Sequence, residues 1–268
     1  MNENKLAKES EESKFALLIY TRVARYGLLR SLAFYTSSVQ LTSFLEEMTY
    51  HELSNFAYAV NILLGIFRDD FDKILNIEIP LNSEIEYAQF LLARCKLLCL
   101  EPTYSNFILV SAFLNNLILT VGAKLKCFRI LYITEFCFLV LQKRFFWKLF
   151  GSKDEYWTLQ KYCDKFHKNF TLDSTLSDLQ NTCVGEYWIN VVQNCLNSTD
   201  VHFPLEDVEE KLYEDEYSNR SQMDCKSKPL IEIESFLFPR YSKRTRKELF
   251  CYYCNSKCYN YLAYANQF

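Results

Sequence analysis

Few side chains in this sequence are placed to do chemistry together, and the best pair is a cysteine and a histidine four residues apart. Cys163 and His167 would lie on one face of a helix, where a thiol and an imidazole can act as nucleophile and base. The other histidines, His51 and His202, are distant in sequence, and no P-loop, HExxH motif or nucleophile elbow is present. Because this spacing also arises by chance in aromatic-rich helices, we expect no enzyme, with a Cys163/His167 hydrolase as the alternative.

Two further groups of residues could bind zinc. Cys251, Cys254 and Cys258 would share one helical face, but a structural zinc site normally has four ligands, so a buried or dimer-facing helix is the favoured interpretation. His51 falls in the first turn of a helix that begins at Thr49, where the positive end of the helix dipole keeps an imidazole neutral and able to bind a metal. The remaining ligands would have to come from a partner chain.

The composition predicts an all-α fold. Five glycines and five prolines in 268 residues are too few for the turns of sheets and barrels, whereas 22 Phe and 19 Tyr supply a large apolar content. Apolar residues recur every three or four positions, and Ser-x-x-Glu or Thr-x-x-Glu capping boxes begin at Thr49, Ser83 and Ser152. Helices are predicted at 14–35, from 49 onward, and at 84–100, 104–121, 124–149, 153–170 and 175–197. Short connections favour a single antiparallel bundle.

The chain divides into four regions by composition. Residues 1–13 are predicted to be a disordered tail, 14–200 the helical bundle, 201–228 an acidic loop and 229–268 a helical segment that docks on the bundle. The net charge of −3 argues against direct nucleic-acid binding, and the basic run at 240–247 is interpreted as a solvated helical face that can add nuclear targeting. Eleven cysteines without a signal peptide indicate a reducing compartment.

Two apolar stretches, 107–121 and 128–141, provide the alternative function, a membrane-associated helical protein that uses them as hairpins. Both are shorter than the roughly 18–20 apolar residues that span a bilayer, and polar residues such as Asn115 and Glu135 interrupt them. We therefore interpret both stretches as buried core helices and expect no membrane contact.

Three stretches resemble, in order and spacing, the TRF-homology domain of telomere proteins. They are Met-Thr-Tyr-His-Glu-Leu at 48–53, Asn-Ile-Leu-Leu-Gly-Ile-Phe at 61–67 and Ile-Pro-Leu at 79–81, and with the preceding amphipathic helix the similarity covers about residues 14–100. The chain departs from the family at 68–70, where Arg-Asp-Asp replaces a glycine. No Myb-type DNA-binding repeat follows the bundle, and in this respect the chain is similar to the Poz-type bridging subunits of fission-yeast shelterin.

The resemblance implies a specific role. A bridging subunit of this type is a nuclear, telomeric homodimer without enzymatic activity, which joins the duplex-bound Rap-type protein to the overhang-associated Tpz-type protein and restrains telomerase. It binds one peptide segment from each, and its helix-start histidine, matched here by His51, shares a zinc site with the Tpz-type partner. Separately, the wide apolar stripe of helix 14–35 predicts that Tyr20 and Leu28 lie in the dimer interface.

Overall fold

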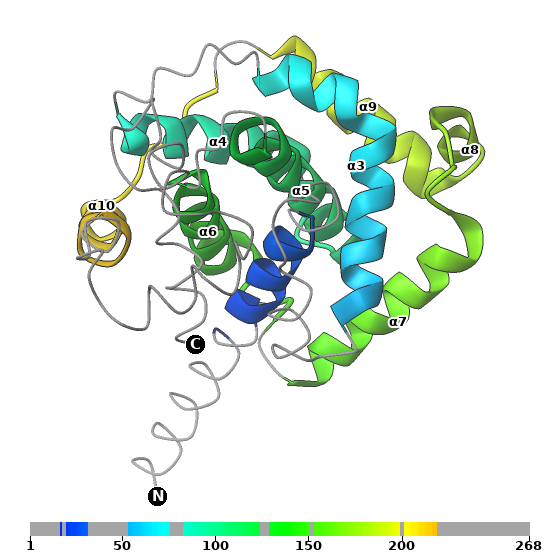
Figure 1. Cartoon of the computed structure of the whole chain (residues 1–268), viewed down its shortest axis with the longest axis horizontal. Coiled ribbons are helices and arrows are strands. Elements are labelled where there is room, and N and C mark those ends of the chain that lie inside the picture. Colours follow the sequence, from blue (N-terminus) through cyan, green and yellow to red (C-terminus); the bar gives the residue numbers. More distant parts are fainter. Residues whose placement is uncertain are drawn as a thin grey trace, which may run out of the picture.

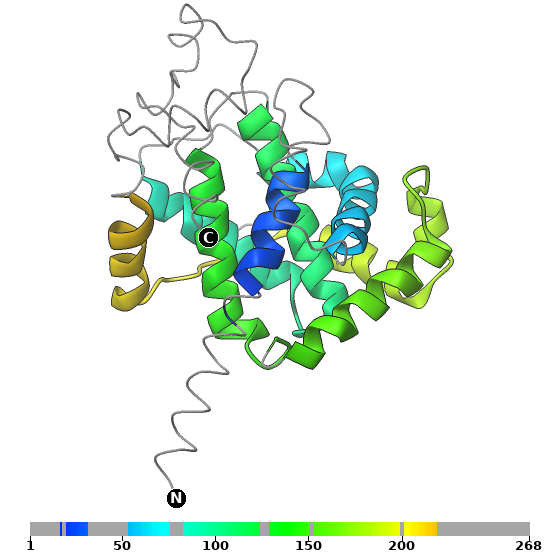
Figure 2. The ribbon, with the colours of Figure 1, turned by 60° about the horizontal axis from the view of Figure 1, so that its bottom comes forward.

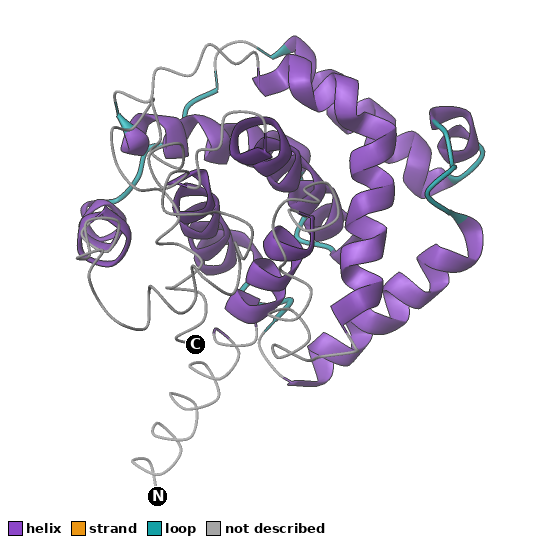
Figure 3. Cartoon of the chain, in the orientation of Figure 1, coloured by secondary structure: helices purple, strands orange, loops and turns teal. Residues whose placement is uncertain are grey.

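Helices make up all of the regular structure in the residues that the structure describes (Figure 3). The computed structural model describes Leu17 and residues 20–31, 53–75, 83–123, 129–150, 153–198 and 201–218. Residues 20–31, called here the N-terminal helix, are followed by α3 (Ser54–Leu75), α4 (Glu84–Leu98), α5 (Tyr104–Leu117), α6 (Arg129–Leu141), α7 (Lys153–Asn169), α8 (Leu176–Gln180), α9 (Cys183–Asn197) and α10 (Asp207–Leu212). Three π-helical turns, η2 (Ile118–Ala123), η3 (Gln142–Phe146) and η4 (Tyr213–Ser218), continue α5, α6 and α10. The predicted all-α class is confirmed.

The helix α5 forms the centre of the bundle (Figure 1). Every residue from 106 to 117 is buried, α3 packs along it and α4 also contacts it, while α8 and α10 lie at opposite edges of the molecule. At its C-terminal end, Asn116 donates a hydrogen bond of 2.8 Å to Asp72 of α3, and Thr120 donates one of 3.1 Å to the same carboxylate. The first apolar stretch is therefore a core helix, as predicted, and its buried polar groups connect it to α3.

Aromatic rings from five segments meet around Phe107 of α5. Its ring centroid lies 5.5 Å from Tyr20, 5.4 Å from Phe56, 6.3 Å from Phe138, 5.3 Å from Phe146 and 4.8 Å from Phe150. Such pairs contribute about 0.5–1.5 kcal/mol each beyond the burial of their area. Much of the aromatic content of the chain thus fills the core, and among the described residues the exposed large aromatics are Tyr58, Trp147 and Trp157.

An ion pair in the core joins the N-terminal helix to α6. The Arg25 guanidinium donates to both carboxylate oxygens of Glu135, through Nε at 2.9 Å and Nη2 at 2.6 Å, and both side chains are about 95% buried or more. In Figure 2 the N-terminal helix lies beside α5 and α6, which agrees with this contact. The planar fork of arginine matches a carboxylate in only a few orientations, so the pair sets how the two helices lie against each other.

Tyr20 and Leu28, predicted to form a dimer interface, lie instead in the core of the single chain. Both side chains are fully buried, and the Tyr20 ring packs 5.1 Å from that of Phe150. The apolar stripe of the N-terminal helix is wide because other parts of the same chain cover it on several sides. The assignment of these two residues is therefore wrong, and an arginine at Tyr20 would disrupt the core rather than separate two copies.

The helix starts follow the predicted caps in part. The Ser83 side chain accepts the Glu86 N–H and the Thr103 side chain accepts the Asn106 N–H, as expected for α4 and α5. The single helix predicted at 175–197 is wrong, because the structure has α8 and α9 with a break between them. Thr182 causes the break by capping α9: its hydroxyl accepts the Gly185 N–H at 3.1 Å and donates to the Leu179 carbonyl at 3.0 Å.

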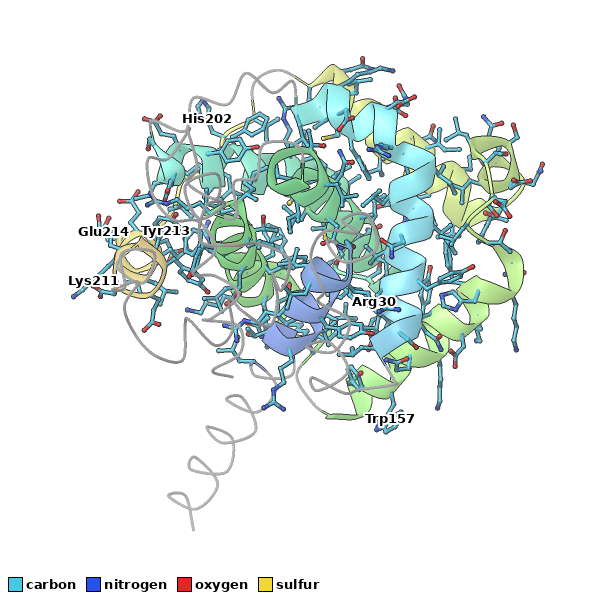
Figure 4. The ribbon with its side chains drawn as sticks, in the orientation of Figure 1. Arg30, Trp157, His202, Lys211, Tyr213 and Glu214 are labelled. Carbon is cyan, nitrogen blue, oxygen red and sulfur yellow. The ribbon has the colours of Figure 1, made fainter. Side chains whose placement is uncertain are left out.

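The prediction of an acidic loop over 201–228 is also wrong for residues 207–218, which form α10 and η4. Glu206 and Glu209 make a capping box at the start of α10, and Tyr213 and Tyr217 are buried against Phe136 of α6. Two inward tyrosines, one helical turn apart, help to dock the segment, even though its other face is acidic. Figure 4 shows Lys211 and Glu214 at the outer edge of the molecule.

Replacing Glu135 with leucine should lower the free energy of unfolding by about 3–5 kcal/mol, because Arg25 would stay buried without this partner. The double variant Arg25→Met/Glu135→Leu should recover most of the loss, since apolar side chains then replace both members of the buried pair. Chemical denaturation followed by circular dichroism measures both. A double variant no more stable than Glu135→Leu alone would show that loss of the carboxylate opposite Arg25 is not the cause.

Two glycines should respond oppositely to alanine. A Cβ at Gly185 would lie 2.2 Å from the Leu179 carbonyl oxygen, so Gly185→Ala should destabilise the α8–α9 corner by about 1–3 kcal/mol. At Gly65, within α3, a Cβ meets nothing within 4 Å, and Gly65→Ala should stabilise the protein by about 0.5–1 kcal/mol. Thermal melts of both variants measure the difference, and equal shifts in one direction would contradict it.

Candidate functional site

A cleft of about 470 Å³ lies between the first half of α4 and residues 201–204, and we call it the α4 cleft. Glu86, Gln89 and Phe90 line one wall, since positions three and four residues apart share one face of a helix. Residues 201–204 form the other wall, and Figure 4 shows His202 at this edge of the molecule. The volume is within the roughly 300–1,000 Å³ that is usual for ligand sites.

The second wall of the α4 cleft is held by one arginine. Arg144 places its guanidinium 4.6 Å from the centroid of Phe203, donates to the Pro204 carbonyl at 3.2 Å and forms a two-point contact with the Glu209 carboxylate. Phe145 adds a ring contact of 6.3 Å to Phe203. Because Arg144 joins residues 203 and 204 to α10, the wall and the acidic helix are positioned together.

A second arginine supports the α4 wall. Arg94 lies 5.2 Å from the ring centroid of Phe90, one turn earlier in α4, and its guanidinium donates to the carbonyl oxygens of Cys195 and Ser198. The ring of Tyr87 also stacks with that of Phe90, with ring centroids 6.0 Å apart and an interplanar angle of 16°. The phenylalanine is thus held half-buried at the surface, where its exposed edge can meet a ligand.

The start of α4 is also the attachment point of η4. Glu84 forms an ion pair with Arg129 of α6 and accepts a hydrogen bond from the Tyr213 hydroxyl. Burial raises the pKa of Tyr213 well above its usual value, and the neighbouring Glu84 carboxylate raises it further, so the hydroxyl stays protonated and donates. These contacts and those of Arg144 fasten α10 and η4 to the bundle at both ends.

The Cys163/His167 pair lacks the features of a nucleophile and its base. The thiol is buried, and burial, with a smaller effect of the Asp164 charge, raises the pKa of Cys163 to about 12. Desolvation lowers the pKa of His167, whose ring packs 4.7 Å from that of Tyr58. A reactive cysteine needs a lowered pKa and access to substrate, and this thiol has neither.

The predicted metal ligands lie outside the described residues. This holds for His51 and its Thr49 cap, and for Cys251, Cys254 and Cys258. Within the described ranges, histidine, cysteine and acidic side chains form no group of three that could hold a metal ion. The zinc site shared with a partner stays a prediction, as does the basic run at 240–247.

The second apolar stretch is also a core helix: residues 130–141 of α6 lie in the bundle and are buried with the exception of Leu139. In the described part of the chain, no helix has both the length and the apolar character needed to cross a membrane. Cys95, Cys99 and Cys137 are buried, as expected of cysteines that pack as small apolar side chains.

The α4 cleft was not predicted from the sequence. Phe90 belongs to the apolar pattern of α4 and gives no sign that one edge stays open, and the 201–204 segment was assigned to the acidic loop. The Val-His-Phe-Pro sequence just before the acidic run was the one available signal, because an apolar segment at a loop start tends to dock on a neighbouring surface.

The chain matches no protein-family model, no curated protein and no solved structure. The function therefore has to be inferred from the residues and from the geometry described above.

Thiol labelling tests the reactivity of Cys163. With its pKa near 12, Cys163 should resist iodoacetamide in the native protein near neutral pH and become labelled only when the pH approaches that value or the chain unfolds. The exposed Cys183 should be labelled before the buried cysteines of the described residues and serves as the internal control. Peptide mapping by mass spectrometry measures both, and rapid selective labelling of Cys163 would revive the hydrolase alternative.

Proposed function

We propose that the protein is a non-enzymatic telomere adaptor, which binds peptide segments of a Rap-type protein and a Tpz-type protein and so joins them and restrains telomerase. In this proposal it works in the nucleus as a homodimer with a bundle of TRF-homology type. The sequence similarity over about residues 14–100 supplies the identity of the partners. The all-α fold is consistent with it and does not by itself select it.

The observation that carries the binding role is the α4 cleft. Grooves between helices accept peptides through apolar anchor side chains, and this cleft offers Phe90, Val201 and Phe203 as apolar lining. Both rings are held in place by arginines, so little side-chain entropy is lost when a ligand binds.

A bridging assay tests the proposal directly. Beads that carry a Rap-type segment should retain a labelled Tpz-type segment only when this protein is added, because neither segment is expected to bind the other. Addition of the free Rap-type segment in excess should release the label. If the protein binds each segment alone but never both, it is not a bridge; if it binds neither, the telomere assignment fails.

The zinc prediction has a separate test. His51→Ala should weaken binding of the Tpz-type segment by about tenfold or more, the scale of one lost metal ligand, and should abolish the effect of added zinc on affinity. Binding of the Rap-type segment and the thermal melt of the free protein should change little. Calorimetry with and without chelator measures this, using His167→Ala as the matched control because His167 lies on α7, outside the lining of the α4 cleft; unchanged affinity in the His51 variant would refute the shared site.

A further inference from the structure

Among the described residues that line the α4 cleft, Glu86 carries a negative charge without a partner. The side chain of Glu86 is exposed, and its carboxylate makes no hydrogen bond or ion pair with the described residues. Of the two hydrogen bonds of the predicted capping box, the structure has the one in which the Ser83 side chain accepts the Glu86 N–H at 3.3 Å. The Glu86 carboxylate does not take part in the cap. The carboxylate is therefore available to a ligand.

The two cations beside the cleft are already engaged. Arg94 is bonded to the carbonyl oxygens of Cys195 and Ser198, and Arg144 is bonded to Glu209 and to the Pro204 carbonyl. Each guanidinium also lies over one of the two rings of the cleft. Neither can swing to Glu86 without breaking these contacts, so among the described residues neither arginine beside the cleft is available to pair with Glu86, and a basic ligand can supply the cation.

The surroundings carry the same sign. After residues 201–204 come Glu206, which pairs with Arg144 at 3.8 Å, and the exposed Asp207, and the outward face of η4 adds Glu214 and Asp215. A field of this sign speeds the approach of a basic ligand and slows that of an acidic one. A purely apolar ligand would have to desolvate Glu86 without compensation, which disfavours it.

We propose that the α4 cleft binds a short peptide with an apolar anchor side chain, seated against Phe90 and Phe203, and a lysine or arginine a few residues away that pairs with Glu86. The inference rests on the proposed adaptor function and names the chemistry of the peptide that this cleft accepts. The anchor supplies buried apolar area, and the charge pair sets which peptides are accepted.

Selection from a phage-displayed library of random peptides tests this without knowledge of the natural partner. On the unmodified full-length protein, enriched peptides should combine Leu, Ile, Met or an aromatic residue with Lys or Arg at a recurrent spacing. On Glu86→Lys, the basic residue should disappear from the enriched set and Asp or Glu should take its place. Glu214→Lys is the matched control, because it changes the net charge equally at an exposed site outside the cleft lining.

Affinities of the best synthetic peptide give the magnitude. By fluorescence anisotropy at low salt, Glu86→Lys should weaken binding by at least about tenfold, the scale of one charge-assisted hydrogen bond, and Glu214→Lys by much less. Glu86→Gln, which keeps a good residue at the helix start, should also weaken binding and remove most of its salt dependence. Thermal melts confirm that each variant is folded.

The inference is overturned if no peptides are enriched, if enriched peptides lack a basic residue, or if they bind Glu86→Lys as tightly as the unmodified protein. These outcomes are separate from those of the bridging assay. Basic peptides that depend on Glu86, together with no retention of the Rap-type and Tpz-type segments, would keep the cleft chemistry and reject the telomere assignment. Bridging that is unaffected by Glu86→Lys would keep the telomere assignment and reject the cleft as the site that binds these segments.

Discussion

The position of the N-terminal helix against α6 depends on the buried contact between Arg25 and Glu135. Two charges that are nearly removed from water are tolerated only when they face each other with good geometry, so the N-terminal helix and α6 have essentially one acceptable arrangement. The aromatic cluster around Phe107 fills the space next to that contact and receives Tyr20 from the same N-terminal helix. Because the buried guanidinium and carboxylate must face each other, the ion pair limits the arrangements in which these rings can pack.

Arginines also shape the surface. Arg94 and Arg144 each combine a ring contact with hydrogen bonds to carbonyl oxygens, and together they fix the two walls of the α4 cleft. Arg129 holds Glu84 at the start of α4, where Tyr213 also bonds. Guanidinium groups suit this task because they have five donors in one plane and an apolar face. The cleft thus depends on contacts from α4, η3, α9 and α10, which are far apart in the sequence.

Prediction from the sequence succeeded where the signal is local. The Ser83 cap and the starts of the helices at 84 and 104 were recognised because each depends on residues within one or two turns. It failed where a partner from elsewhere in the chain decides the outcome. Seven acidic residues in 206–216 suggested a solvated loop, but Arg144 neutralises Glu209, and Glu84 and Phe136 receive the two inward tyrosines. Tyr20 was placed at a dimer surface because a wide stripe on one helix does not show which neighbours cover it.

By itself, the sequence determined the helical class, the approximate extent of most helices and the absence of a favourable catalytic pattern, because periodicity and capping act over a few residues. Only the tertiary structure decided that Cys163 is buried with a raised pKa and that Tyr20 and Leu28 belong to the core. It also decided that the exposed Glu86 lines the α4 cleft together with Phe90 and Phe203. The reason is physical: burial, ion pairing and cleft shape depend on groups brought together by long-range packing, and no local pattern encodes which groups will meet.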